Sequence, residues 1–337
     1  MRAVGLHHYL PIDHPESLLD LELPVPEPGE NDLRVAVRAV SVNPVDTKLR
    51  APKPQVESQA RVLGFDAAGV VDAVGSKVRL FKPGDAVFYA GSIARPGSNA
   101  ELQLVDERIV GRMPKNLSFA QAAALPLCAL TAWELLFDRL EIPRATPTSD
   151  AVLIIGAAGG VGSFATQLAR RLTKLRVIGT ASRAESSEWV HSMGAHHVLD
   201  HSQPLAGQVE KLLGAGVRYV VSLTGTDQHW KEIAELIAPE GRFGLIDDPQ
   251  TALDLRLFKR KSVSLHWEFM FTRAIFETDD PLAQHRILNH VAELVETGVL
   301  RSTLHAELGP MCAANLRRAH SLIESGRTIG KLVLSGL

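Results

Sequence analysis

The chain has 337 residues, 45% of them hydrophobic and 22% charged, and a formal net charge of −2 at pH 7, so its length predicts two domains rather than one hydrophobic core. The near-neutral charge gives no electrostatic reason to expect a nucleic acid or a membrane as partner, and without a signal segment or an uncharged apolar run of membrane-spanning length we expect a cytoplasmic protein. The two cysteines, Cys128 and Cys312, permit neither a disulfide framework nor a cysteine-built metal cage.

From Met1 to about Leu125, short strand candidates are separated by turn signals. In the segment Leu33–Val40, apolar residues alternate with polar or small ones, which is the period of a half-buried strand. Further strands are expected within Arg61–Gly75, Gly84–Gly91 and Ala100–Val105. Such a succession is typical of a partly open β-barrel.

Two other stretches of this region have a distinct composition. Pro52–Gln59 is polar and contains proline, and it predicts a loop, either an ordinary surface loop or a mobile one over a cleft. Ser118–Phe137 is rich in helix formers and is broken at Pro126. We expect this second stretch to cross from one domain to the other.

The most informative stretch is a buried strand, a glycine turn and a helix in succession. Ala151–Ile155 is an apolar run of strand length, and helical periodicity begins after the turn. A bound pyrophosphate needs this order, because glycines let the backbone approach the phosphates while free amides and the helix dipole face the anion. Ala157 replaces the first glycine of the G-x-G-x-x-G motif. The prediction of a dinucleotide site therefore rests on the order of strand, turn and helix rather than on the motif alone. The expected cofactor-binding residues of the turn are Gly156, Ala157, Gly159, Gly160, Val161 and Gly162.

Strands and helices alternate beyond this turn, which predicts a doubly wound parallel sheet with the ligand at the carboxyl ends of its strands. The expected strands are Leu175–Ser182, His197–Asp200, Val217–Leu223, Gly241–Ile246 and Ser262–Phe269. After Phe269 the alternation weakens to two amphipathic helix candidates and a last strand, Gly330–Leu334.

The end of the second strand of this sheet indicates which dinucleotide binds. An NAD-binding fold usually places a carboxylate there to accept a hydrogen bond from the ribose 2′-hydroxyl. That position is Ala181, followed by Ser182 and Arg183. Serine and a guanidinium suit a 2′-phosphate, so we expect NADPH rather than NADH. The alternative is that Arg183 is an ordinary solvated arginine.

Several strings along the chain resemble the medium-chain dehydrogenase/reductase superfamily, in its zinc-independent quinone oxidoreductase branch and the subgroup called zinc-type alcohol dehydrogenase-like. The resemblance implies a GroES-like catalytic domain at 1–125, completed by 270–337, and a Rossmann NADP-binding domain at 126–269. It rests on SVNPVDTK (Ser41–Lys48), LGFDAAGVV (Leu63–Val71), FKPGDAV (Phe81–Val87), LTAWE (Leu130–Glu134), GAAGGVG (Gly156–Gly162) and GRTIGKLVL (Gly326–Leu334).

The sequence departs from this family at the zinc ligands. The first cysteine position holds Asn43, the Gly-His-Glu motif reads Gly64-Phe65-Asp66, and the third position falls at Leu127 or Cys128. Tetrahedral zinc needs three or four nitrogen, sulfur or oxygen ligands, so we expect no bound metal. His196, His197 and His201 are not expected to form a metal cluster either, because neighbouring strand residues point to opposite faces.

A site without zinc favours acceptors that tolerate the negative charge left by hydride transfer, such as quinones and α,β-unsaturated carbonyls. Polar residues near the former zinc site are the candidates for catalysis. Asn43 could orient the substrate or the nicotinamide ribose, and Asp46 and Asp66 could relay a proton; each could instead cap or turn the backbone. Tyr89 is a candidate general acid or a core residue, and Phe65 a cleft wall or a core residue.

The resemblance also implies cofactor contacts outside the glycine turn. Thr131 corresponds to a threonine that touches the nicotinamide, and His201 to a side chain beside the adenosine ribose. Thr224 and Lys331 are weaker candidates.

The leading hypothesis is therefore an NADPH-dependent quinone or enone reductase. Its alternatives are a zinc-type alcohol or aldehyde dehydrogenase and a non-catalytic NADPH-binding sensor. The resemblance suggests a homodimer, paired through the edge strand Ser262–Phe269.

Overall fold

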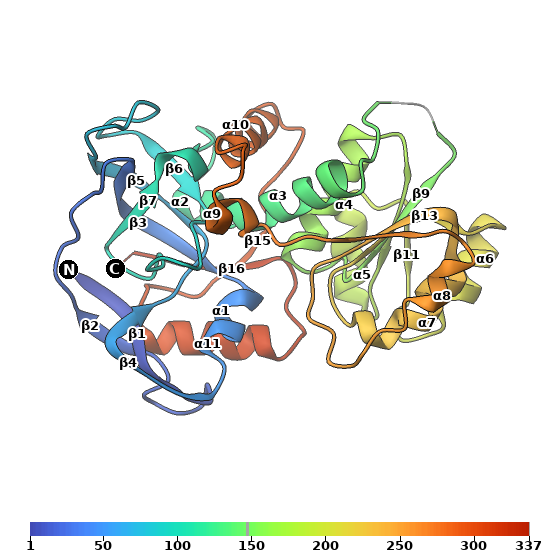
Figure 1. Cartoon of the computed structure of the whole chain (residues 1–337), viewed down its shortest axis with the longest axis horizontal. Coiled ribbons are helices and arrows are strands. Elements are labelled where there is room, and N and C mark those ends of the chain that lie inside the picture. The colour runs from blue at the N-terminus through green and yellow to red at the C-terminus, as the bar shows by residue number, and fades with distance from the viewer. Residues whose placement is uncertain (146–147, 337) are drawn as a thin grey trace. The chain divides into compact units, whose positions relative to one another are not determined.

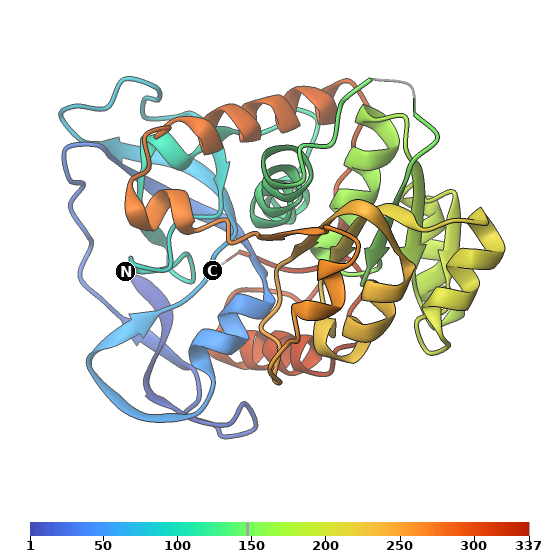
Figure 2. The ribbon, with the colours of Figure 1, turned by 45° about the vertical axis from the view of Figure 1, so that its right-hand side comes forward.

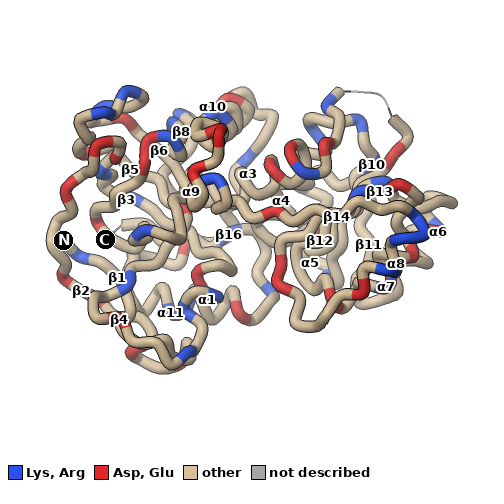
Figure 3. Tube along the Cα trace, in the orientation of Figure 1, with Lys and Arg blue, Asp and Glu red and all other residues tan. Residues whose placement is uncertain are grey.

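The computed structural model describes residues 1–145 and 148–336 and divides into two compact units. The first unit comprises Met1–Leu130 and Phe271–Leu337, and the second comprises Thr131–Met270. Figure 1 labels their elements, and Figure 3 shows acidic and basic residues interspersed along the trace of each unit.

The first unit is built on two sheets. A three-stranded antiparallel sheet has the order β2-β1-β4, and a seven-stranded sheet has the order β15-β16-β3-β5-β6-β8, with β7 also paired to β3. The strands are β1 (Arg2–Tyr9), β2 (Leu19–Glu22), β3 (Asp32–Val42), β4 (Lys53–Val62), β5 (Ala67–Val74), β6 (Ala86–Tyr89), β7 (Leu102–Asp106), β8 (Gly111–Arg112), β15 (Leu304–Glu307) and β16 (Lys331–Ser335). The helices are α1 (Pro44–Arg50), η1 (Glu107–Ile109), α2 (Phe119–Ala123), α9 (Thr272–Phe276), α10 (Ala283–Glu296) and α11 (Ala313–Glu324).

The loop expected at Pro52–Gln59 is wrong, because all of this segment after Pro52 lies in β4. It pairs with β1 in antiparallel register, with Lys53 opposite Tyr9 and Val56 opposite His8. The strand is at the edge of its sheet and is largely exposed. Edge strands are often polar, which protects them from pairing with other chains, and this explains why the segment lacks an apolar alternation.

The second unit contains a six-stranded parallel sheet with the order β11-β10-β9-β12-β13-β14. Helices flank both faces of this sheet (Figure 2), as right-handed crossovers in both directions from β9 require. The strands are β9 (Ala151–Ile155), β10 (Arg176–Thr180), β11 (His197–Leu199), β12 (Val217–Ser222), β13 (Ile237–Leu245) and β14 (Ser264–Trp267). The helices are α4 (Gly160–Leu172), α5 (Ala184–Ser192), α6 (Leu205–Leu213), α7 (Thr226–Leu236) and α8 (Arg256–Lys259). The predicted α/β class with a doubly wound parallel sheet is confirmed.

The helical stretch 119–139 consists of α2, α3 (Pro126–Trp133) and the π-helix η2 (Glu134–Arg139). It is the one helical stretch of the described residues that is long and apolar enough to cross a membrane, but 89% of its apolar window is buried within the protein. This burial is typical of a core helix. The expected break at Pro126 is confirmed, because α2 ends at Ala123 and α3 begins at Pro126, a first-turn position that proline tolerates well.

Candidate active site

The glycine turn forms a cradle between β9 and α4. Gly156 has φ +82°, a conformation that side chains rarely adopt, and a Cβ at this position would lie 2.9 Å from Thr224 Cγ2. Gly159 is the N-cap of α4, and no side chain caps this helix. The amides of its first turn, formed by Gly160, Val161 and Gly162, therefore remain available to an anion. This geometry fits a dinucleotide pyrophosphate.

Gly162 permits the close approach of α4 to the turn. A Cβ at Gly162 would lie 2.3 Å from the carbonyl oxygen of Gly156 and 2.6 Å from the Cα of Ala157. Ala157 itself is fully buried, and a Cβ at Gly179 would meet its side chain at 2.9 Å. The methyl group of Ala157 thus packs inside the unit, so only its backbone could contact a cofactor.

The carboxyl end of β10 is tied to this cradle. The hydroxyl of Thr180 accepts a hydrogen bond from the Gly156 amide at 3.1 Å and lies 3.2 Å from His201 Nδ1. Sequence reasoning missed Thr180, although its place at the end of a buried strand could have indicated it. His201 and Thr224, two of the predicted cofactor-binding residues, therefore lie close to the glycine turn.

None of the three residues that follow Thr180 at the end of β10 carries a carboxylate. Ala181 is buried, Ser182 is exposed, and Arg183 is half-buried at the N-cap of α5. Thr131, another predicted cofactor residue, lies buried on α3.

In the first unit, four predicted residues meet in one buried hydrogen-bonded network. Lys331 Nζ lies 3.0 Å from Asp66 Oδ2 and donates to Asn43 Oδ1 and to the carbonyl of Val42. Asn43 Nδ2 donates to Asp66 Oδ2 at 2.9 Å, and the backbone amide of Asn43 donates to Asp46 at 2.7 Å.

Other groups complete the network around its carboxylates. Asp66 also accepts from Ser41 Oγ at 2.8 Å and from the Leu127 amide at 2.8 Å, and Asp46 accepts from the Gly64 amide at 3.1 Å. Sequence reasoning missed Ser41. The four predicted residues of the network are all buried: Asn43, Asp46, Asp66 and Lys331. Because their polar groups are bonded to one another and to the Gly64 amide, the network fixes the position of the backbone around Gly64. Lys331, a weaker cofactor candidate by sequence, has its ammonium committed here.

Tyr89 and Phe65 are core residues in this structure. Tyr89 lies on β6, fully buried, and its hydroxyl has no hydrogen-bond partner among the described residues. Burial raises its pKa well above the usual value, which argues against a general acid. Phe65 packs edge to face against Phe271, with ring centroids 5.6 Å apart, so both side chains are packed in the core in this structure.

The side chains at the former zinc positions do not suit zinc. Phe65 offers no donor, and the amide of Asn43 is already engaged by Lys331 and Asp66. Burial raises the pKa of Cys128 to about 12, so its thiol keeps its proton and is a poor ligand. Among the described residues, no group of three or more His, Cys, Asp or Glu could hold a metal. A cation at Asp66 would have to replace the Lys331 ammonium.

The Asp46 carboxyl makes stability depend on pH. Burial raises its pKa to about 7, against the opposing effects of the Asn43 amide and Lys331. The unfolded chain loses this proton near 3.8, so between these values the folded state binds more protons and the free energy of unfolding falls as pH rises.

Asp46→Asn should abolish this slope. Relative to the variant, the wild-type protein should lose about 2.5 kcal/mol of unfolding free energy between about pH 5 and 7.5. Urea unfolding of both proteins across this range measures the difference. A difference that stays constant with pH would show that Asp46 ionises normally.

Family models and relatives place the chain among known proteins. Residues 29–115 match the model of the alcohol dehydrogenase GroES-like domain, and residues 193–334 match that of the zinc-binding dehydrogenase. A zinc-type alcohol dehydrogenase-like protein of Staphylococcus epidermidis is 40% identical over 99% of both chains. A quinone oxidoreductase of Pseudomonas aeruginosa is 33% identical over 91% of this chain and 92% of the relative.

Solved structures show the same fold along the whole chain. The crystal structure of a candidate zinc-dependent alcohol dehydrogenase from Rhizobium etli is 57% identical, covers 100% of this chain and 98% of its own, and superimposes with a TM-score of 0.96. The quinone oxidoreductase of Escherichia coli complexed with NADPH is 27% identical over 99% of this chain and 100% of its own, with a TM-score of 0.83. An NAD-dependent alcohol dehydrogenase is 29% identical over 99% of both chains, with a TM-score of 0.82. This chain therefore belongs to the medium-chain dehydrogenase/reductase superfamily and is an NAD(P)-dependent oxidoreductase.

Proposed function

We propose that this protein is an NADPH-dependent reductase that acts on quinones or α,β-unsaturated carbonyls without a catalytic metal. The observation that carries the proposal is that the zinc positions hold Phe65, which has no donor atom, and Asn43, whose amide is engaged by the buried network with Asp66 and Lys331. Oxidation of a simple alcohol requires a Lewis acid or a strong base to remove the hydroxyl proton, and this network supplies neither.

The reduced nicotinamide would supply a hydride, and a quinone or enone can accept it because the resulting phenolate or enolate spreads its charge. Gly156 and Gly162 allow the tight turn and the close approach of α4 to it, and the uncapped first turn of α4 offers backbone amides to the pyrophosphate. Ser182 and Arg183 at the end of β10 support the choice of NADPH, since a carboxylate is missing there and a guanidinium pairs well with a phosphate.

The test is consumption of NADPH with 1,4-benzoquinone or 9,10-phenanthrenequinone, measured together with the dissociation constants of NADPH and NADH. Arg183→Glu should weaken NADPH binding by about tenfold or more and leave NADH binding nearly unchanged. Arg176→Glu is the matched control, because Arg176 lies exposed at the opposite end of the same strand.

Other outcomes separate the alternatives. Stoichiometric zinc in the purified protein, with activity lost on chelation, would favour an alcohol dehydrogenase. Tight NADPH binding with zero turnover across quinones and enones would favour a sensor.

We also propose a homodimer formed through β14. This strand is at the edge of the parallel sheet. Its last residue, Trp267, is 53% exposed, and Phe269, which follows the strand, is 47% exposed. An open edge with exposed aromatic residues favours strand pairing with a second copy.

Trp267→Lys should shift the protein from dimer to monomer in light scattering at micromolar concentration, with its circular dichroism spectrum unchanged. Phe276→Lys is the control, because Phe276 is 73% exposed but lies on the helix α9 rather than on a strand. A wild-type monomer, or a Trp267→Lys variant that stays dimeric, would contradict this interface.

A further inference from the structure

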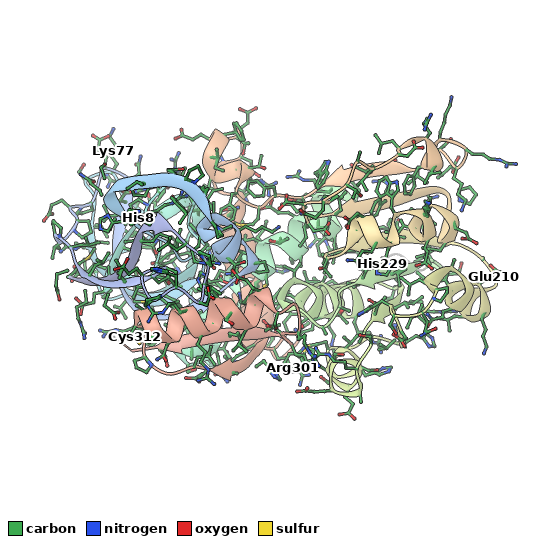
Figure 4. The ribbon with its side chains drawn as sticks, turned by 90° about the horizontal axis from the view of Figure 1, so that it is seen from below. His8, Lys77, Glu210, His229, Arg301 and Cys312 are labelled. Atoms are coloured by element: carbon green, nitrogen blue, oxygen red, sulfur yellow. The ribbon has the colours of Figure 1, made fainter. Side chains whose placement is uncertain are left out.

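Two imidazoles lie in contact at the carboxyl end of the parallel sheet. His201 follows β11, and His229 projects from α7, where Figure 4 labels it. Their ring centroids are 6.4 Å apart with the planes at 69°. We refer to His201 and His229 as the histidine pair. Nothing in the sequence pattern singled out His229.

The histidine pair is anchored at both ends. His201 Nδ1 lies 3.2 Å from Thr180 Oγ1, and the same hydroxyl accepts from the amide of Gly156. His229 Nδ1 lies 3.4 Å from Glu232, whose other carboxylate oxygen accepts from the Leu205 amide at 3.0 Å. These contacts connect His229 through His201 to the glycine turn.

The position of the pair relates it to the adenosine end of the cofactor. β11 and β10 are parallel neighbours, with Leu199 opposite Thr180. His201 and Arg183 therefore follow adjacent strand ends, where the 2′-phosphate is expected to bind.

The charged groups around His201 come from three elements. Arg183 is the cationic neighbour, His229 is the second imidazole, and Asp200 is the acidic neighbour. Burial, then His229 and Arg183, lower the pKa of His201, and Asp200 opposes them. Glu232 is the acidic neighbour of His229. Without a ligand, the ring of His201 is thus mostly neutral at pH 7 and able to take up a proton.

We propose that the histidine pair is a proton-accepting part of the 2′-phosphate site, so that NADPH binds with uptake of a proton and binds more tightly as pH falls. The inference rests on the proposed use of NADPH. A dianionic phosphate beside an imidazole stabilises the imidazolium, and by linkage each proton taken up makes the affinity rise up to tenfold per pH unit. NADH lacks this phosphate and should not have the effect.

The test is isothermal titration calorimetry of the wild-type protein with NADPH and with NADH, in two buffers of different ionisation enthalpy, between about pH 6.5 and 8. The buffer dependence of the enthalpy gives the number of protons exchanged. Proton uptake of about half a proton or more near pH 6.5 is expected with NADPH and almost none with NADH. The phosphate has a pKa near 6 and would release protons at a cationic site, so uptake must come from the protein.

Single variants identify the groups responsible. His201→Gln and His229→Gln should each reduce the uptake and flatten the pH dependence of NADPH affinity, whereas NADH affinity should show little pH dependence in the wild type and in both variants. His191→Gln is the control, because His191 is exposed on α5. A purely packing role for the pair would change the affinities for both dinucleotides alike, without altering proton exchange.

Two failures can be distinguished. Tight, selective NADPH binding without proton uptake, or with uptake unchanged in both variants, would overturn the inference and leave the proposed function standing. NADPH binding no tighter than NADH binding would overturn the cofactor assignment, and the inference with it.

Discussion

Replacement of Gly162 by alanine is expected to weaken NADPH binding by about a hundredfold and to lower the free energy of unfolding by about 2 to 3 kcal/mol. The added Cβ would lie 2.3 Å from the Gly156 carbonyl oxygen and 2.6 Å from the Ala157 Cα. Both atoms belong to the backbone, so the clash cannot be relieved by turning a side chain. Either α4 or the turn must move, and the amides that face the pyrophosphate move with it.

Gly207→Ala is the matched control for this prediction. Gly207 lies within α6, and a Cβ there would have nothing within 4 Å. Because alanine is favoured over glycine in a helix, this variant should be neutral or more stable by up to about 1 kcal/mol. Calorimetric binding and urea unfolding measure both effects. NADPH affinity within threefold of wild type in Gly162→Ala would contradict the proposed cradle.

The cradle and the parallel sheet could be predicted from the sequence because their signals are local. The apolar run before Gly156 becomes β9, and the helical periodicity after Gly162 becomes α4. The orientation of Ala157 could not be predicted from its neighbours in sequence. Its methyl group faces the core because it packs against Gly179, a residue of the next strand, β10.

The buried network could be predicted only in part. Asn43, Asp46 and Asp66 were singled out because they stand near the zinc positions, but Lys331 was expected at the cofactor. Its partner Asn43 is 288 positions away in sequence. The antiparallel pairing of β16 with β3 brings the two together, with Leu332 opposite Val42. The sequence patterns of β3 and β16, each taken alone, do not predict that the two strands pair.

The edge strand β4 and Tyr89 show two further limits of sequence patterns. β4 lies at the edge of its sheet, so its polar residues imitate a loop. Tyr89 is opposite Ala67 in the sheet, next to the polar network, yet its hydroxyl is buried without a partner among the described residues. Composition alone does not separate a catalytic tyrosine from a core one, since both suit a strand.

Replacement of Lys331 by methionine is expected to lower the free energy of unfolding by about 3 to 5 kcal/mol near neutral pH. Methionine keeps much of the side-chain volume and removes the ammonium, which leaves the buried Asp66 carboxylate without its cationic partner. Urea unfolding near neutral pH measures this loss.

A second substitution tests whether the unpaired charge is the cause. Lys331→Met combined with Asp66→Asn removes both charges, and it should recover at least half of the loss, because neutral replacement of a buried ion pair is often well tolerated. Lys77→Met is the control: Lys77, labelled in Figure 4, forms an exposed ion pair with Glu30, and its loss should cost less than about 1 kcal/mol.

NADPH binding separates a positioning role for Lys331 from direct cofactor contact. The ammonium is buried and bonded to Asp66, Asn43 and the Val42 carbonyl. The folded Lys331→Met variant should therefore bind NADPH within about threefold of wild type, while its turnover of quinone falls because the backbone around Gly64 and Phe65 loses its support. A dissociation constant raised by tenfold or more, with stability unchanged, would instead place the ammonium on the cofactor and contradict a positioning role for Lys331.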